Sequence, residues 1–361
     1  MVVEGKMAEE GRAVARAKRT PQAEADRRSR RILALLGVLV VALAVFALTS
    51  GRFAVSAGDA LKICLAQFVD IPQTWSDKAE TMVATVRVPR VLGAILVGAA
   101  LSVSGAAYQG MFKNPIVSPD ILGVSSGACV GAATAILLHV GGLETQLFAL
   151  LGGLAAVAIT VSVPKLFRNR GKLMLVLAGV LVSGFMGSLL SFLKYVADAD
   201  SELAEIVYWT MGSLASVRGK DIALMGPVIL VAMAVLLAMR WRVNLLSLGD
   251  NEARSLGVNV RRTRAVVIAC STLLTSTAVC ICGTIGWVGL IVPHACRLIV
   301  GQDNKNLLPA SVLVGAAFML VVDTVCRTLT VNEIPLSIFT GLIGVPLFVV
   351  LLAAQRTRLE G

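Results

Sequence analysis

The sequence predicts an all-α polytopic membrane protein, and three observations support this class. Hydrophobic residues make up 57% of the 361 residues and charged residues 15%, which is more apolar surface than a soluble domain of this size can bury. Long stretches carry no charge, as helices that cross a bilayer require. These stretches are continuous rather than alternating, which disfavours a transmembrane β-barrel.

Ten apolar segments have spanning or near-spanning length for a hydrocarbon core about 30 Å thick. The eighth is short and contains Pro293, which is consistent with a broken or tilted helix. We therefore expect ten transmembrane helices near residues 32–49, 88–108, 119–139, 145–166, 173–194, 221–239, 265–284, 286–300, 307–327 and 335–354.

The distribution of Lys and Arg predicts that both termini are cytoplasmic. With the N-terminus inside, only nine of the 33 Lys and Arg residues fall in outside segments, as the positive-inside rule expects. Residues 1–31 are polar and basic, and no clear small-residue cleavage site follows them. We expect a disordered cytoplasmic tail there, a retained first helix, and a second cytoplasmic tail at 356–361.

The net charge of +11 would suit a nucleic-acid-binding protein, but the basic residues lie beside hydrophobic segments, where membrane topology requires them. The sequence thus predicts contact with membrane lipid and none with nucleic acid. The seven cysteines form no Cys-x-x-Cys pair, and six lie in or near apolar runs. This favours small buried side chains over metal ligands or disulfides.

The stretch FKNPIVSPDILGVSSGACVG (112–131) interrupts the apolar sequence on the inside. Pro115 and Pro119 end one helix and set the start of the next, where a missing N–H costs little. Asp120 lies near the positive end of that next helix, where an acid is stabilised. A small-residue ridge for close helix packing follows at Gly123, Gly127 and Gly131.

Three arginines at outer helix ends run against the positive-inside bias: Arg87, Arg90 and Arg327. They can extend to lipid headgroups, or they can bind an acidic partner through bidentate pairs. Asp323 lies one turn before Arg327, so an internal pair is also plausible.

Two connecting segments are expected to be helical. Residues 201–214 predict a short amphipathic helix at the outer interface, anchored by Tyr208 and Trp209. Inside, GDNEARSLGVNVRRTR (249–264) predicts a helix of about two turns, capped by Asp250 or Asn251 and ended by Gly257. Composition alone leaves open whether this second segment is an ordinary basic loop.

Catalytic and nucleotide-binding motifs are absent from the sequence. It contains no His-Glu-x-x-His, no Gly-x-Ser-x-Gly and no P-loop, so any ATP hydrolysis by a P-loop mechanism belongs to another subunit. Acidic residues within the spans are sparse, which weakens a proton-driven carrier but leaves a sodium-driven secondary transporter as the alternative. His294 is best interpreted as a packing or capping group.

Residues 87–133 resemble the hallmark region of the FecCD-type permeases, the membrane subunits of binding-protein-dependent ABC importers for iron–siderophore complexes, haem and cobalamin. The resemblance covers about residues 32–355, which would form one permease domain. Further matching segments follow in the family's order: LAGV (177–180), YWTMGSL (208–214), GDNEARSLGVNV (249–260), GTIGWVGLIVPHACRL (283–298) and EIPLSIFTGLIGVPLFVVLL (333–352).

The resemblance implies a ten-helix transport subunit that is not an enzyme and binds no cofactor. It implies a multi-pass protein of a bacterial or archaeal inner membrane. Its partners would be a second permease subunit, identical or different, two cytoplasmic ATPases that hold ATP and Mg²⁺, and an extracytoplasmic binding protein. An iron–siderophore chelate is the first choice of cargo, with haem and cobalamin open.

The resemblance also implies roles for individual residues. Arg87, Arg90 and Arg327 would receive acidic residues of the binding protein. The coupling helix that contacts the ATPase would comprise Asp250, Asn251, Glu252, Ala253, Arg254, Ser255, Leu256, Gly257 and Val258.

The translocation path would follow the fifth span and the outer helix after it. The candidate residues are Lys172, Leu173, Ser183, Gly184, Gly187 and Ser188, although small residues also serve plain helix packing. Lys172 and Leu173 stand where the cobalamin permease has small hydroxyl residues, which disfavours cobalamin.

Overall fold

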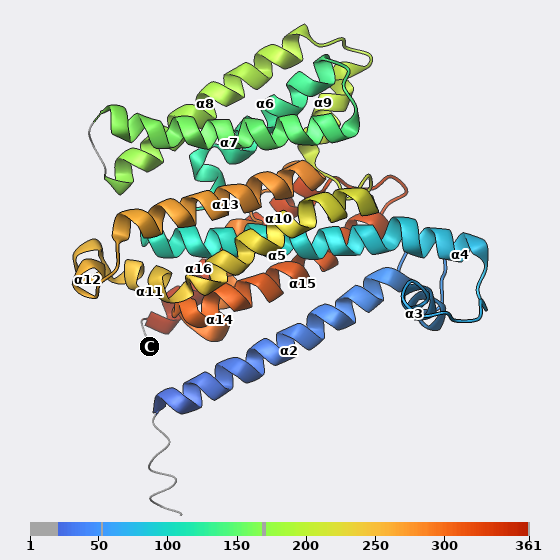
Figure 1. The fold of residues 1–361 in the computed structure, drawn as a ribbon, viewed down its shortest axis with the longest axis horizontal. Coiled ribbons are helices and arrows are strands. Elements are labelled where there is room, and N and C mark those ends of the chain that lie inside the picture. Colours follow the sequence, from blue (N-terminus) through green and yellow to red (C-terminus); the bar gives the residue numbers. More distant parts are fainter. Residues whose placement is uncertain (1–20, 52, 168–170, 360–361) are drawn as a thin grey trace, which may run out of the picture.

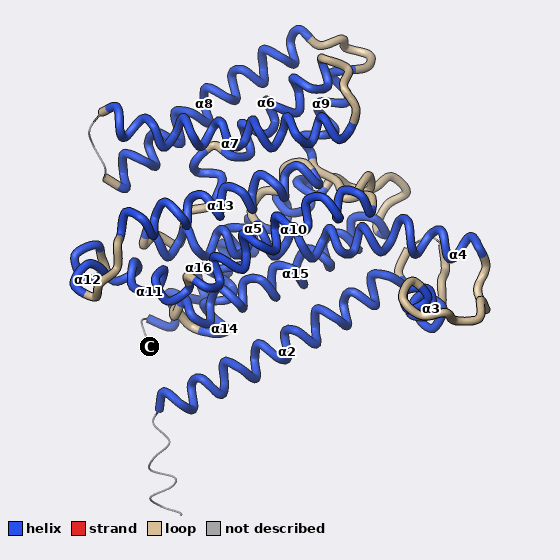
Figure 2. Tube along the Cα trace, in the orientation of Figure 1, coloured by secondary structure: helices blue, strands red, loops and turns tan. Residues whose placement is uncertain are grey.

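The computed structural model describes residues 21–51, 53–167 and 171–359, and within these ranges the chain is built of helices and loops without strands (Figure 2). Seven helices are long and apolar enough to cross a membrane. They are α2 (Pro21–Thr49), the continuous stretch from α4 (Asp77–Thr81) through η1 (Met82–Arg87) to α5 (Val88–Phe112), α7 (Gly142–Leu166), α8 (Lys172–Val196), α10 (Gly219–Ala238), α13 (Val260–Cys282) and α15 (Asn304–Thr328).

The other three predicted spans contain shorter apolar helices: α6 (Val124–Leu137), α14 (Val288–Val300) and the apolar part of α16 (Leu336–Leu359), which ends at Leu351. The break before α6 has a local cause. Pro119 starts a 3-10 turn, η2 (Pro119–Leu122), and Gly123 then takes a left-handed conformation with φ of 83°, which glycine tolerates. A helix of 13 residues, such as α14, is only about 20 Å long.

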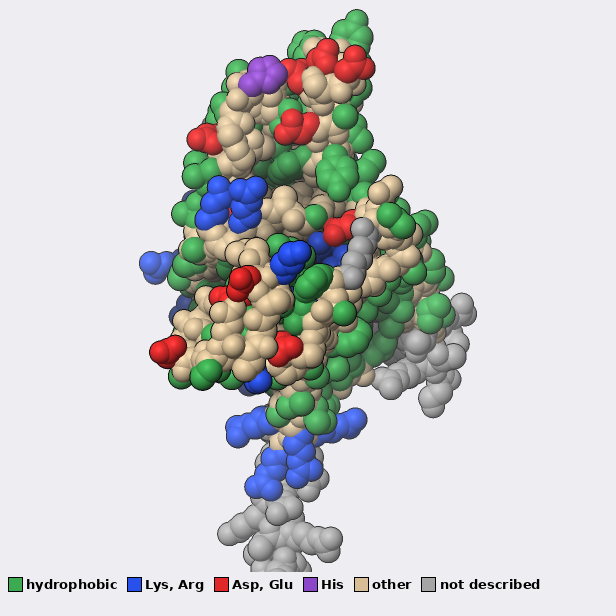
Figure 3. Space-filling model, turned by 90° about the vertical axis from the view of Figure 1, so that its right-hand side faces the viewer, with side chains coloured by type: hydrophobic (Ala, Val, Ile, Leu, Met, Phe, Trp, Pro, Cys, Tyr) green, Lys and Arg blue, Asp and Glu red, His purple; other side chains and the backbone are tan. Residues whose placement is uncertain are grey.

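Helix α2 begins earlier than expected. The predicted disordered tail covered residues 1–31, but residues 21–31 continue the first apolar helix without a break. Residues 1–20 lie outside the described residues. The exposed side chains of Arg27, Arg28, Arg30 and Arg31 gather just before the grey part of the chain (Figure 3). Ala, Glu and Arg are good helix formers, so a helix already anchored by its apolar part extends through them.

The helices form two groups with α2 beside them (Figure 1). The larger group surrounds α5, which packs against α10, α13, α14 and α15. The smaller group contains α6, α7 and α8, and it joins the larger group through α13. Following the predicted topology, we call the end with α3 (Ala57–Ala66), α4 and α9 (Glu202–Met211) the outer end. The inner end carries α11 (Arg240–Leu248) and α12 (Asp250–Ser255).

Glycine pairs allow the central backbones to touch. A Cβ added to Gly105 of α5 would overlap the carbonyl oxygen of Gly289 in α14. In the smaller group, Gly127 and Gly131 of α6 meet the α7 backbone in the same way, which confirms a small-residue ridge at these two positions. Gly123 instead packs against Ser183 of α8.

The Gly105→Ala substitution is therefore expected to destabilise the protein by about 1–3 kcal/mol, because two backbones must separate to admit one methyl group. The measurement is the denaturation midpoint in mixed detergent micelles. Gly37→Ala is the matched control, since nothing lies within 4 Å of a Cβ at Gly37 in α2. Equal midpoints for the two variants would contradict this account of the α5–α14 contact.

The predicted outer helix is present as α9. Ile206 is buried and Tyr208 is exposed on it, in agreement with an amphipathic helix. The turn before it is organised by Asp198, which accepts hydrogen bonds from the Ser201 hydroxyl and from two backbone amides. The hydrogen bond from Ser201 is the main cause that lowers the pKa of this carboxyl group.

Candidate functional site

The three outer arginines lie in one cluster with two carboxylates, which we call the outer arginine cluster: Arg87, Arg90, Asp323, Arg327 and Glu333. All three arginines are buried. The structure therefore brings together the residues that the sequence singled out, but it directs their guanidinium groups inward, to partners within the chain.

Arg87 and Arg327 bind the C-terminal end of α2. Arg87 donates to the carbonyl oxygens of Leu48 at 2.7 Å and Thr49 at 3.3 Å, and also to that of Phe53. Arg327 donates to Ser50 at 2.9 Å and to Ala47. The last carbonyl groups of a helix lack partners within it and carry partial negative charge. Two arginines from α15 and η1 therefore cap α2.

Arg90 binds both carboxylates of the cluster. Its Nε donates to Asp323 at 2.9 and 3.1 Å, and its two terminal nitrogens donate to the two oxygens of Glu333, each at 2.9 Å. Asp323 also lies 3.7 Å from Arg327, so the internal pair that the sequence suggested is present. Glu333 was not foreseen; it lies 243 residues from Arg90 in the chain.

The inner end presents α12 on the surface. Asn251, Glu252, Arg254, Ser255, Leu256 and Gly257 are exposed, whereas Ala253 and Val258 are buried beneath them. Two backbone hydrogen bonds, from Gly257 to Arg254 and from Val258 to Ala253, close the helix, and Gly257 has φ of 80°. This is the glycine stop that the sequence predicted.

The start of α12 differs from the expectation. No side chain caps the helix, because the cap position is Gly249. Asp250 instead forms an ion pair of 2.5 Å with Arg264 at the start of α13. The pair connects the first residue of α12 to the second turn of α13.

The predicted path residues lie mostly on the open face of α8. Leu173, Gly184, Gly187 and Ser188 are exposed, and no atom lies within 4 Å of a Cβ at either glycine. Ser183 is half-buried against Gly123. The side chain of Lys172 lies outside the described residues. Among the described residues, Gly184 and Gly187 therefore pack against no other helix of the chain.

A cavity of about 390 Å³ opens beside Gly187. It is lined by Asp120 at the break before α6, by Thr284 and Trp287 before α14, and by Ser337 in the first turn of α16. Sequence reasoning assigned Asp120 to a structural turn and did not place it beside α8. The break at Pro119 and Gly123 could have indicated this position, because an interrupted helix can leave space for a neighbouring side chain.

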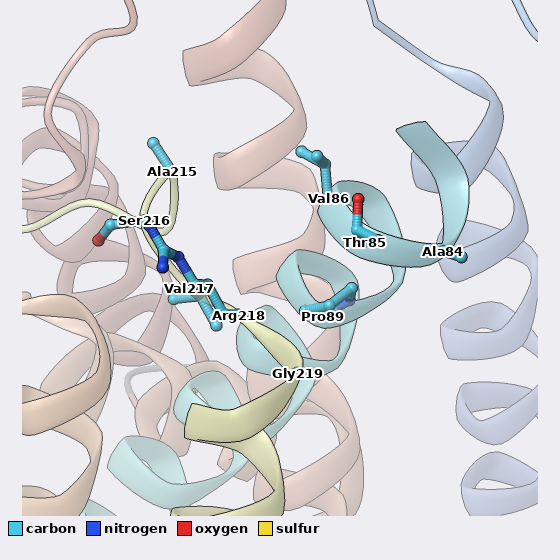
Figure 4. A pocket seen from close by; sticks show the side chains of 9 residues that line it. All are labelled: Ala84, Thr85, Val86, Pro89, Ala215, Ser216, Val217, Arg218 and Gly219. Carbon is cyan, nitrogen blue, oxygen red and sulfur yellow. The ribbon is translucent and has the colours of Figure 1, made fainter. Parts of the chain in front are cut away.

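The outer end also has two hollows around the loop before α10. One, of about 520 Å³, lies between Ala84–Pro89 and Ala215–Gly219, with Arg218 on the loop side and Thr85 and Val86 opposite (Figure 4). The other, of about 800 Å³, lies between α7, α9 and α10 and includes Glu205, Trp209 and Lys220. Among the described residues, no group of three His, Cys, Asp or Glu side chains could hold a metal ion.

Comparisons with known proteins agree with this arrangement. The model of a family described as the FecCD transport family matches residues 38–354. The molybdate import permease MolB of Haemophilus influenzae is 41% identical over 323 residues, which cover 89% of this chain and 95% of that protein. The cobalamin import permease BtuC of Halobacterium salinarum is 42% identical, over 80% of this chain and 76% of that protein.

A solved structure is similar in three dimensions. It is described as an inward-facing conformation of a metal-chelate type ABC transporter, with a TM-score of 0.81 and 39% sequence identity. The match covers 90% of this chain and 99% of that chain.

Proposed function

The chain belongs to the FecCD transport family, and from this premise we propose how its described surfaces serve import. It is the permease subunit of an ABC importer and a multi-pass protein of a bacterial or archaeal inner membrane. We propose that all ten apolar helices take part in crossing the bilayer, with both termini cytoplasmic. The seven long helices and the three shorter apolar ones support this topology, because a short helix that is largely buried among others, as α14 is, need not span alone.

We propose that the open face of α8 lines the translocation path. A face with Gly184 and Gly187 uncovered within one chain can line a path once a second permease subunit lies opposite. The second subunit is either another copy of this chain or a related permease. Its cargo would then slide along backbone and small side chains, which offer few strong contacts.

We propose a metal chelate, with an iron–siderophore complex first, as the cargo. Relatives named for molybdate, cobalamin, iron chelatin and hemin are all 38–42% identical to this chain. Sequence identity therefore does not distinguish between these cargoes. Asp120 borders the cavity beside α8. A carboxylate repels a small oxyanion strongly, whereas a large chelate spreads its charge over many atoms. Molybdate is the second candidate, because one relative over nearly the whole length carries that name.

The driving force would come from two ATPases that bind ATP and Mg²⁺, while this chain supplies no nucleotide site. On the inside, the exposed residues of α12 would contact an ATPase, and the Asp250–Arg264 pair would pass its movement to α13. On the outside, an extracytoplasmic binding protein would dock and release cargo. Each partner shifts the permease between inward-open and outward-open states by binding one of them better.

Reconstitution tests this proposal directly. We expect proteoliposomes with the permease, the co-encoded ATPase and the co-encoded binding protein to take up a radiolabelled ferric chelate only when ATP is present. Uptake that persists without ATP or the ATPase would contradict the proposal and favour a carrier driven by an ion gradient. Uptake of labelled molybdate in place of the chelate would support the importer function but would contradict the proposed cargo.

A further inference from the structure

The two carboxylates that bind Arg90 differ in their access to solvent. The Asp323 side chain is 2% exposed, whereas that of Glu333 is 32% exposed. Arg90 itself is buried, so Glu333 is the one of its two carboxylate partners that solvent reaches. Glu333 lies in the connection between α15 and α16, where the side chains of Leu329 and Val331 are exposed.

The charges of the outer arginine cluster do not balance. Three guanidinium groups face two carboxylates, which leaves one positive charge in excess. The carbonyl groups at the end of α2 offset part of it, because a helix end carries about half an elementary charge. The cluster as a whole therefore still attracts an anionic group, although each arginine has partners.

We propose that the Arg90 guanidinium is a carboxylate-binding site that Glu333 fills in the resting permease, and that an acidic side chain of the extracytoplasmic binding protein displaces Glu333 on docking. This inference rests on the proposed import function. Arg90 suits such an exchange because its two terminal nitrogens form a planar fork that accepts any carboxylate in the same geometry. Asp323 holds the Nε side throughout, so the fork keeps its direction.

The exchange has a consequence for the rest of the chain. Glu333 is three residues before Leu336, where α16 begins. Without the Arg90 contact, the segment is held by backbone hydrogen bonds from Ile334 to Cys326 and from Leu336 to Gly212, the residue that follows α9. Ser337, in the first turn of α16, lines the cavity beside α8. Docking at Arg90 would therefore loosen the segment that positions one wall of this cavity.

A permanent structural pair is the competing explanation, and the two predict opposite changes in affinity. A resident competitor lowers the apparent affinity by the fraction of time that it fills the site. We therefore expect Glu333→Gln to bind the co-encoded binding protein about tenfold more tightly than the wild type, measured at low salt with the permease in nanodiscs. A permanent pair predicts unchanged or weaker binding for Glu333→Gln, and that result would overturn the exchange.

Glu205→Gln is the matched control, because Glu205 is an exposed acid of the outer end that has no part in the cluster. Similar gains in both variants would mean that only the overall charge matters, and this would overturn the exchange as well. Wild-type permease that binds its ATPase but never the binding protein would contradict the docking step of the proposed function. Tight docking without a gain for Glu333→Gln would refute the exchange alone.

A second measurement does not depend on affinity. Val331 is 83% exposed, so a spin label on Val331→Cys can report the mobility of the segment before α16, with the unsubstituted chain as the labelling background. We expect docking to raise this mobility in the wild-type background, and Glu333→Gln to raise it without any partner. Mobility that docking leaves unchanged, in a permease shown to bind the partner, would rule out displacement of Glu333.

Discussion

Replacing Leu256 by Asp is expected to lower ATP-driven transport by about 30-fold, because the loss of a central apolar anchor at an interface costs about 2 kcal/mol or more. Leu256 directly follows α12 and is 54% exposed. In an isolated permease nothing requires a large apolar side chain in that position. If α12 enters a groove on the ATPase, Leu256 becomes buried there, and a carboxylate in its place would be left without a partner.

The measurement is chelate uptake together with ATPase activity in the same proteoliposomes. Leu166→Asp serves as the control, since Leu166 is a highly exposed apolar residue at the inner end of α7 and lies outside α12. We expect the control to retain transport. Full transport by the Leu256 variant would show that the contact with the ATPase lies elsewhere on the inner end.

Removing Asp323 is expected to cause the largest loss of stability of any single change considered, about 3–5 kcal/mol for Asp323→Ala. The carboxylate accepts from Arg90 and lies near Arg327. Without it, one fewer negative charge faces three buried guanidinium groups. The measurement is again the free energy of unfolding in mixed detergent micelles.

Asp221→Ala is the comparison, because Asp221 is also a buried acid, but its partners among the described residues are two neutral donors, the Gln146 side chain and the Arg218 amide. Loss of such hydrogen bonds costs about 1 kcal/mol each. An Asp323 variant no less stable than the Asp221 variant would mean that the cluster contributes no net electrostatic stabilisation. The partly exposed Glu333 should matter much less for stability than Asp323, which separates its role in docking from a role in folding.

The positions of the membrane helices were predictable because hydrophobic length is a local property. Each of the ten expected segments contains an apolar helix of the structure. The glycine stop at Gly257 and the ridge at Gly127 and Gly131 are also confirmed. Both depend on a local property, because glycine tolerates a left-handed backbone and lets another backbone approach closely. The extension of α2 to Pro21 was not predicted. The segment before the apolar run is basic and lacks an apolar pattern, so its composition suggested a disordered tail despite its good helix formers.

The environment of the arginines could not be predicted in this way. Arg87 caps a helix that ends 38 residues earlier, and Arg90 binds acids that lie more than 230 residues further along the chain. Spacing identified Arg87 and Arg90 as unusual cations, but it carries no information on which carbonyl groups or carboxylates they would meet. The cavity beside Gly187 was missed similarly, because its walls come from four separated segments.

Hydropathy and short motifs can be read along the chain, and they suffice to identify an all-α membrane permease, the positions of its apolar helices and its family. Three further features depend on the folded chain: the outer arginines are buried and bound internally, Glu333 binds Arg90, and Asp120 borders the open face of α8. These features arise from contacts between residues far apart in sequence, and burial and charge pairing exist only once those residues have been brought together.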